Sequence, residues 1–80
     1  MMQERYEAAK AATGPDVICL FRSGDFYEAL HGDAEKIADE IGLTLTANRD
    51  GARMAGFQCR QLDRYLAALI AAGYRCAVVE

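Results

Sequence analysis

Cysteine and histidine are scarce in this chain, and their scarcity limits the chemistry that it can host. The three cysteines, Cys19, Cys59 and Cys76, are odd in number and far apart, and His31 is the only imidazole. Structural zinc sites use sets of closely spaced Cys and His ligands, and disulfide frameworks need paired cysteines. We therefore expect no metal site, no disulfide and no cofactor.

Long apolar runs and an excess of basic residues are also missing. No apolar stretch approaches the roughly 20 residues that a membrane-spanning helix needs, and residues 1–6 form no signal-peptide pattern. We therefore expect a cytoplasmic protein without membrane contacts. The formal net charge is −3, with nine Lys and Arg against 12 Asp and Glu. Because binding through DNA phosphates needs clustered Lys and Arg, any contact with DNA is expected to be local.

Common enzyme motifs are absent as well. The sequence has no phosphate-binding loop of the Gly-x-x-x-x-Gly-Lys-Ser/Thr type, so we expect no ATP hydrolysis by this chain. Asp25, Glu28 and Asp33 lie near one another, but no nucleophile with an adjacent base accompanies them, and His31 is alone. A small enzyme is therefore the weakest of the functional hypotheses, and we expect no catalytic residues.

The patterns that are present are typical of one small α/β domain. Hydrophobic residues make up 52% of the chain and charged residues 26%, as in ordinary globular domains. Good helix formers and apolar spacings of three and four predict three helices, at residues 3–12, 34–41 and 61–72. Short apolar or alternating runs predict about five strands, at residues 17–21, 26–30, 43–46, 53–57 and 76–79. We expect residues 1–80 to form a single domain, a small mixed β-sheet flanked by three helices.

Some residues also predict how these elements begin, pair and pack. The unbroken apolar runs at residues 17–21 and 76–79 predict buried strands, and Gly24 predicts a tight hairpin between the first two strands. Asp33 is expected to cap the second helix. The inward face of the third helix is expected to hold Leu62, Tyr65, Leu66, Leu69 and Ile70. Hairpins imply antiparallel pairing and helical crossovers imply parallel pairing, but the spatial order of the strands is not readable.

Phe26 and Glu28 form the most informative pair of side chains. Successive side chains of a strand point to opposite faces, so these two project together while Tyr27 turns away. A Phe in a strand of a small domain more often belongs to the core. An unpaired carboxylate is costly to bury, however, so we expect this face to be open, with ring and acid side by side at a sheet edge.

The segment from Phe21 to Glu28, Phe-Arg-Ser-Gly-Asp-Phe-Tyr-Glu, resembles the part of MutS that meets a mismatched base pair. The likeness continues in family order and with similar spacing over almost the whole chain. It includes Tyr6, Lys10, Asp33-Ala34, Leu43-Thr44-Leu45-Thr46, Met54-Ala55-Gly56, Tyr65-Leu66 and the run from Gly73 to Glu80. The chain thus resembles the N-terminal mismatch-recognition domain, domain I, of the MutS family.

This resemblance implies a function in DNA mismatch repair. It implies that a Phe-x-Glu motif, here Phe26 and Glu28, probes mispaired or unpaired bases from the minor groove of double-stranded DNA. The ring would stack on the base and the carboxylate would hydrogen-bond to it. The family holds DNA mainly through other domains, so we expect weak binding by the isolated domain and a partnership with the remaining domains of a MutS-like protein.

Arginines are the candidate contacts with the DNA backbone or with loops. The candidates are Arg22, Arg49, Arg53 and Arg60. Arg64 belongs to the same basic concentration. The alternative is that these arginines are ordinary solvated surface residues.

The chain departs from the family pattern after Met54-Ala55-Gly56. Where the family usually has a small apolar residue, Pro, an aromatic and His, this chain has Phe57, Gln58, Cys59 and Arg60. In addition, Arg53 stands where a Pro is usual, and Ser23 stands where a Met is common. These changes leave a second hypothesis open. A protein-interaction module could keep the fold, lose DNA probing and dock another protein through an exposed apolar face.

Overall fold

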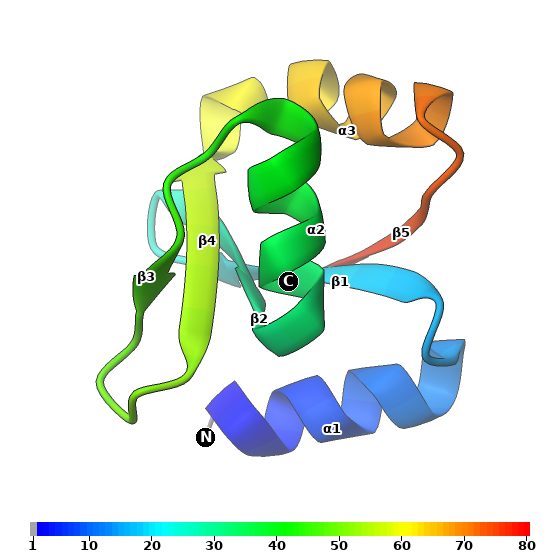
Figure 1. The fold of residues 1–80 in the computed structure, drawn as a ribbon. Helices are drawn as coiled ribbons and strands as arrows, with labels where there is room; N and C mark the ends of the chain where they lie inside the picture. Colours follow the sequence, from blue (N-terminus) through cyan, green and yellow to red (C-terminus); the bar gives the residue numbers. More distant parts are fainter. Residues whose placement is uncertain (1) are drawn as a thin grey trace.

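The computed structural model describes residues 2–80 and folds them into one sheet flanked by helices (Figure 1). The described elements are α1 (Met2–Thr13), β1 (Val17–Ser23), β2 (Phe26–Leu30), α2 (His31–Ile41), β3 (Thr46–Ala47), β4 (Arg53–Gln58), the 3-10 helix η1 (Cys59–Gln61), α3 (Leu62–Ala71) and β5 (Arg75–Val79). The predicted α/β class, with three α-helices and a five-stranded mixed sheet, is confirmed.

The strands lie in the order β3-β4-β2-β1-β5. Strands β1 and β2 form the expected hairpin, in which Gly24 adopts φ 59°, a left-handed conformation that glycine reaches without steric cost. Strand β1 pairs in parallel with β5, and the other neighbouring strands are antiparallel. The expectation that Phe26 and Glu28 stand at a sheet edge is wrong, because β2 is the middle strand.

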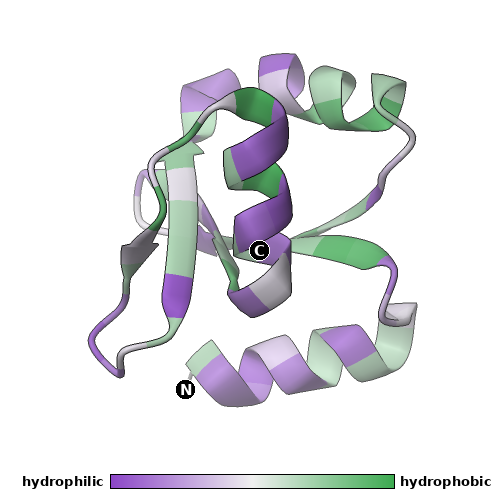
Figure 2. Cartoon of the chain, viewed as in Figure 1, coloured by the Kyte–Doolittle hydropathy of each residue, from purple (hydrophilic) through white to green (hydrophobic). Residues whose placement is uncertain are grey.

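The core lies between the sheet and helices α2 and α3. Ile18, Leu20, Tyr27, Ala29 and Phe57 face these helices and are buried. Fully burying a side chain of the size of Leu or Phe stabilises a fold by roughly 1.5–3 kcal/mol, so this layer supplies much of the stability. In Figure 2, strand β1 is mostly coloured hydrophobic, whereas the visible surface of α2 is mostly hydrophilic.

Helix α1 covers part of the opposite face of the sheet, below β1 in Figure 1. The Tyr6 ring lies 6.4 Å from the Phe21 ring, and the Arg5 guanidinium lies 5.5 Å from that ring. Phe21 is fully buried as a result. The run at residues 17–21 is therefore covered on both faces, as predicted.

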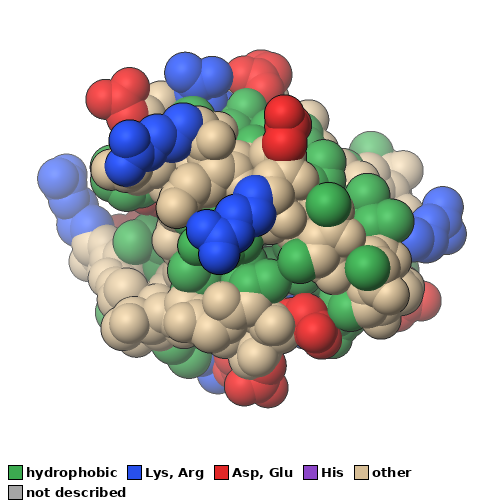
Figure 3. All heavy atoms as spheres, turned by 90° about the horizontal axis from the view of Figure 1, so that it is seen from above, with side chains coloured by type: hydrophobic (Ala, Val, Ile, Leu, Met, Phe, Trp, Pro, Cys, Tyr) green, Lys and Arg blue, Asp and Glu red, His purple; other side chains and the backbone are tan. Residues whose placement is uncertain are grey.

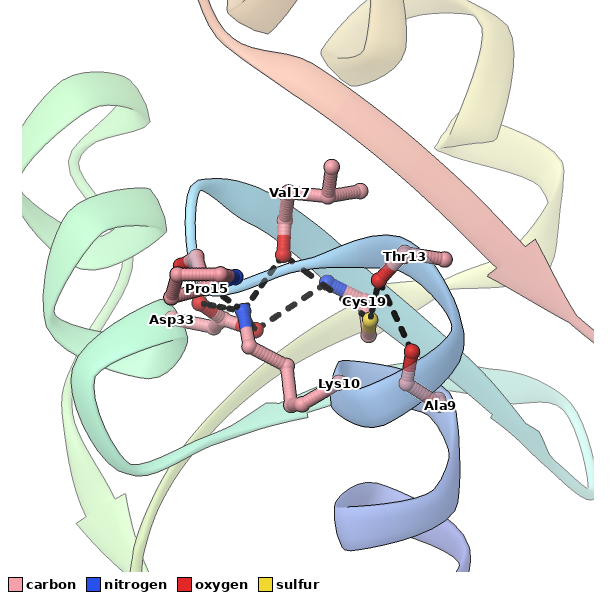
Figure 4. Close-up of polar contacts among 7 residues, drawn as sticks. All are labelled: Ala9, Lys10, Thr13, Pro15, Val17, Cys19 and Asp33. Carbon is pink, nitrogen blue, oxygen red and sulfur yellow. Dashed lines mark hydrogen bonds and ion pairs between the residues drawn. The ribbon is translucent and has the colours of Figure 1, made fainter.

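An ion pair between a partly buried lysine and a buried aspartate attaches α1 to the rest of the domain (Figure 4). The Lys10 Nζ donates to both carboxylate oxygens of Asp33, each at 3.0 Å, and to the backbone oxygens of Pro15 and Val17. The backbone N–H of Cys19 donates to the same carboxylate at 3.1 Å. Asp33 was predicted to cap α2. This is wrong, because α2 begins at His31 and the buried Asp33 side chain bonds to α1 and β1 instead.

Three further expectations about packing are wrong. Strand β3 contains only Thr46 and Ala47, because the preceding residues cross from α2 to the sheet and Leu43 packs against the core. Ile70 is 57% exposed, since it lies about 80° around the helix from Leu62, at the margin of the apolar stripe. Strand β5 is only partly buried, because it forms one edge of the sheet. Within residues 2–80, no helix is both long and apolar enough to cross a membrane.

Candidate nucleic-acid interface

The side chains of β2 separate sharply between the two faces of the sheet. Tyr27 is 4% exposed and belongs to the core, whereas Phe26 is 45% exposed and Glu28 is half-buried on the other face. This alternation follows from the two-residue period of a strand. The structure therefore brings Phe26 and Glu28 together on one face, and the Phe26 ring meets solvent.

Strand β4 leaves space beside this pair. Gly56 lies directly opposite Glu28 in the antiparallel register. A Cβ atom at Gly56 would be 2.7 Å from the backbone oxygen of Tyr27 and 3.2 Å from the Glu28 Cγ, so only glycine fits without a shift. A shallow hollow results, lined by Phe26, Glu28, Thr46, Met54 and Gly56.

The hairpin that carries Phe26 is held by several hydrogen bonds. The Cys59 backbone N–H donates to the Asp25 oxygen at 2.8 Å, which ties the end of β4 to the turn. The Arg22 Nε donates to the Gly24 oxygen, also at 2.8 Å. The exposed ring thus stands on a well-connected turn in the middle of the sheet, which limits the entropy that would be lost on binding.

Two of the four candidate arginines lie away from Phe26 and Glu28. Arg22 is on the opposite face, where its guanidinium lies 5.7 Å from the Tyr27 ring and its Nη1 lies 3.6 Å from a Glu80 carboxylate oxygen. The Arg53 Nε lies 2.7 Å from a carboxylate oxygen of Glu35 in α2. Both cations therefore neutralise local acids.

Arg49 and Arg60 lie on either side of the exposed pair. Arg49 is exposed in the loop after β3 and lines a second hollow together with Glu28. Arg60 is exposed in η1 and lines a hollow beyond the end of β4 with Asp25, Gln58 and Cys59. These two are the candidate arginines whose positions suit contacts around the exposed face.

The charge distribution on the surface is mixed. On the face seen in Figure 3, Lys and Arg are scattered among Asp and Glu and separated by apolar side chains. On the core side of β2, the Tyr27 hydroxyl donates to Glu80 at 2.7 Å, and this bond, with burial, raises the pKa of Tyr27. On the other face, β2 presents the exposed Phe26 ring and the half-buried Glu28 carboxylate.

Gly56, Met54, Thr46 and Gln58 are members of this face that sequence reasoning did not single out as site residues. Gly56 carried a usable signal, because a glycine inside a strand often marks a close approach of another group. The other three became visible only with the register of β3, β4 and β2, which brings them beside Phe26 and Glu28.

The fold and this face together define a small α/β domain that presents an aromatic ring and an acid from the middle of a mixed sheet. The family model described as MutS domain I matches residues 1–80, and the chain belongs to that family. A DNA mismatch repair protein MutS of Rhodopirellula baltica is 47% identical over 83 aligned positions, which cover 99% of this chain. Those of Methanosarcina mazei and Phocaeicola vulgatus are 45% and 42% identical, over 99% and 100% of this chain. The chain spans 9% of the length of each of these relatives.

Proposed function

We propose that this domain recognises mispaired or unpaired bases in double-stranded DNA, with Phe26 as an aromatic wedge and Glu28 as a hydrogen-bond acceptor. The observation that carries the proposal is the 45% exposure of Phe26 on the face that it shares with Glu28. Exposure of one ring is not unusual by itself, but this ring stands on the same face as a carboxylate two residues away in the same strand. Tyr27, Ala29 and Leu30 of the same strand, in contrast, are buried.

The energetics of wedging explain how such a face can distinguish damaged from intact pairing. Inserting an apolar side chain between base steps from the minor groove costs a few kcal/mol of unstacking. The cost is lowest where a base is mismatched or already unpaired. Glu28 repels phosphate and favours a base donor, so it disfavours non-specific contacts. Discrimination then needs no reading of a particular sequence.

The domain is poorly equipped to hold DNA by itself. The net charge is −3, and two of the four candidate arginines are paired with acids of the domain itself. Because affinity for duplex DNA comes mainly from neutralised phosphates, binding by the isolated chain is weak. The proposed role is therefore that of a probe without ATPase activity, which works with the remaining domains of a MutS-like protein that grip the duplex.

Amide NMR spectra of the chain at low salt test this proposal. Adding a duplex with one G·T mismatch should shift the backbone signals of residues 24–29, whereas the fully paired duplex should leave them almost unchanged. Phe26→Ala should abolish the difference. Ile70→Ala is the matched control, since it removes another exposed apolar side chain from the distant helix α3.

The same titration separates the two hypotheses for this fold. If the signals of residues 24–29 do not respond to the mismatched duplex at high concentration, DNA probing is refuted. A module that docks another protein would then be the better account of the exposed Phe26.

A further inference from the structure

Gln58 lies immediately beside the exposed aromatic ring. It is the cross-strand partner of Phe26 in the β2 and β4 register, so its side chain stands on the same face as the ring. Gln58 is exposed, and its amide makes no hydrogen bond within the described chain. A free primary amide thus lies next to the proposed wedge, with both a donor and an acceptor available.

The position of this amide is well defined although its side chain is free. Gln58 ends β4, and the Cys59 N–H that follows is bonded to the Asp25 oxygen in the β1 and β2 turn. The backbone on both sides of Gln58 is therefore attached to the segment that carries Phe26. If the Phe26 ring inserts into the base stack of a duplex, the neighbouring base pair therefore comes within reach of the Gln58 amide.

The chemistry of the minor groove suits such an amide. Adenine N3 and thymine O2 are acceptors on the groove floor, while a G·C pair adds the donor amino group of guanine. Asn and Gln are among the side chains that read this pattern in minor-groove complexes. Glu28, when ionised, can only accept a hydrogen bond, so the donors directly across from Phe26 are the short Ser23 hydroxyl on β1 and the Gln58 amide on β4. Of these two side chains, Gln58 has the longer reach to the acceptors on the groove floor.

We propose that Gln58 is a specificity-determining residue that reads the base pair next to the mismatch. Its Nε2–H donates to adenine N3 or thymine O2, on a groove floor that the guanine amino group of a G·C pair would obstruct, so the domain prefers mismatches flanked by A·T pairs. This inference rests on the proposed function. It adds a preference for sequence context that Phe26 and Glu28 do not supply.

The test uses short duplexes with one G·T mismatch flanked by A·T, G·C or inosine·C pairs. Inosine lacks the guanine amino group, so inosine·C presents acceptors to the minor groove much as A·T does. The wild-type chain should bind the A·T and inosine·C contexts about two- to tenfold more tightly than the G·C context, the worth of one neutral hydrogen bond. The side-chain NH₂ signals of Gln58 should shift in those two contexts.

Gln58→Ala should remove the context preference and keep the preference for mismatched over paired DNA. The variant should fold normally, because Gln58 makes no side-chain cap hydrogen bond to η1. Gln61→Ala, at the far end of η1, is the control of the same residue type and should keep the context preference.

Two results would overturn the role of Gln58 but leave the proposed function standing. One is a context preference that Gln58→Ala leaves unchanged, and the other is a wild-type chain that prefers mismatched DNA but shows no context preference. A wild-type chain without any preference for mismatched DNA would overturn the proposed function, and the Gln58 inference with it.

Discussion

The ion pair between Lys10 and Asp33 allows a quantitative prediction about stability. Side-chain exposure is 3% for Asp33 and 16% for Lys10, so Lys10→Met leaves a buried carboxylate without its cation. Breaking one side of a buried pair costs about 3–5 kcal/mol. An 80-residue domain has a total unfolding free energy of roughly 4–12 kcal/mol, so the variant should lose about a quarter of it or more.

Asp33→Asn should cost less than Lys10→Met. The Asn oxygen can still accept from the Cys19 N–H, which the Asp33 carboxylate accepts from now. The Lys10 ammonium keeps the Pro15 and Val17 oxygens and is close enough to the surface to regain water. The expected cost is about 1.5–3 kcal/mol, the range of a lost hydrogen bond to a charged group.

Guanidinium unfolding followed by circular dichroism measures these costs. With an m-value of about 2 kcal/mol/M, Lys10→Met should lower the midpoint by roughly 1.5–2.5 M. Lys36→Met is the control, because Lys36 of α2 makes no ion pair in the described structure, and it should change stability by less than about 0.5 kcal/mol.

The double variant gives the decisive comparison. Lys10→Met with Asp33→Asn should be less destabilised than the sum of the single variants by about 1–3 kcal/mol, because the second change removes the stranded charge. If the single costs are equal and simply add, the buried pair is not what attaches α1, and the argument from burial fails.

Three further predictions concern single residues. Gly56→Ala should lower the unfolding free energy by about 1–3 kcal/mol in a denaturant melt, because the new Cβ meets the Tyr27 backbone oxygen. Gly32→Ala, which has open space around it, should be neutral or stabilising. Equal effects of the two variants would refute the close approach at Gly56. His31 has φ 56°, so His31→Gly should be more stable than His31→Ala by about 1 kcal/mol, a difference that vanishes if the backbone there is unstrained. The raised pKa of Tyr27 shows that the fold favours the neutral phenol, so the contribution of Tyr27 to stability is complete below about pH 10 and is lost as the pH rises through the raised pKa. Between pH 9 and about 11.5, the unfolding free energy of Tyr27→Phe should therefore fall less steeply than that of the wild type. Parallel curves for the two proteins would contradict this.

The sequence by itself determined the local elements and the class of the fold. Helix formers predicted the three helices, and Gly24 predicted the turn of the first hairpin, where it does adopt a positive φ. The two-residue period of a strand alone predicted that Phe26 and Glu28 share one face. These predictions succeeded because they depend on conformational preferences of neighbouring residues.

Only the tertiary structure decided which residues meet across the chain. The register put Gly56 and Gln58 beside Glu28 and Phe26, and the docking of α1 turned Asp33 from an expected cap into the partner of Lys10. The tertiary structure also places the Arg22 and Arg53 side chains away from Phe26 and Glu28, beside Tyr27 and Glu35. Strand order and helix docking depend on which distant segments bury their faces against each other. The periodicity of neighbouring residues predicts the local elements but not which of them pack together.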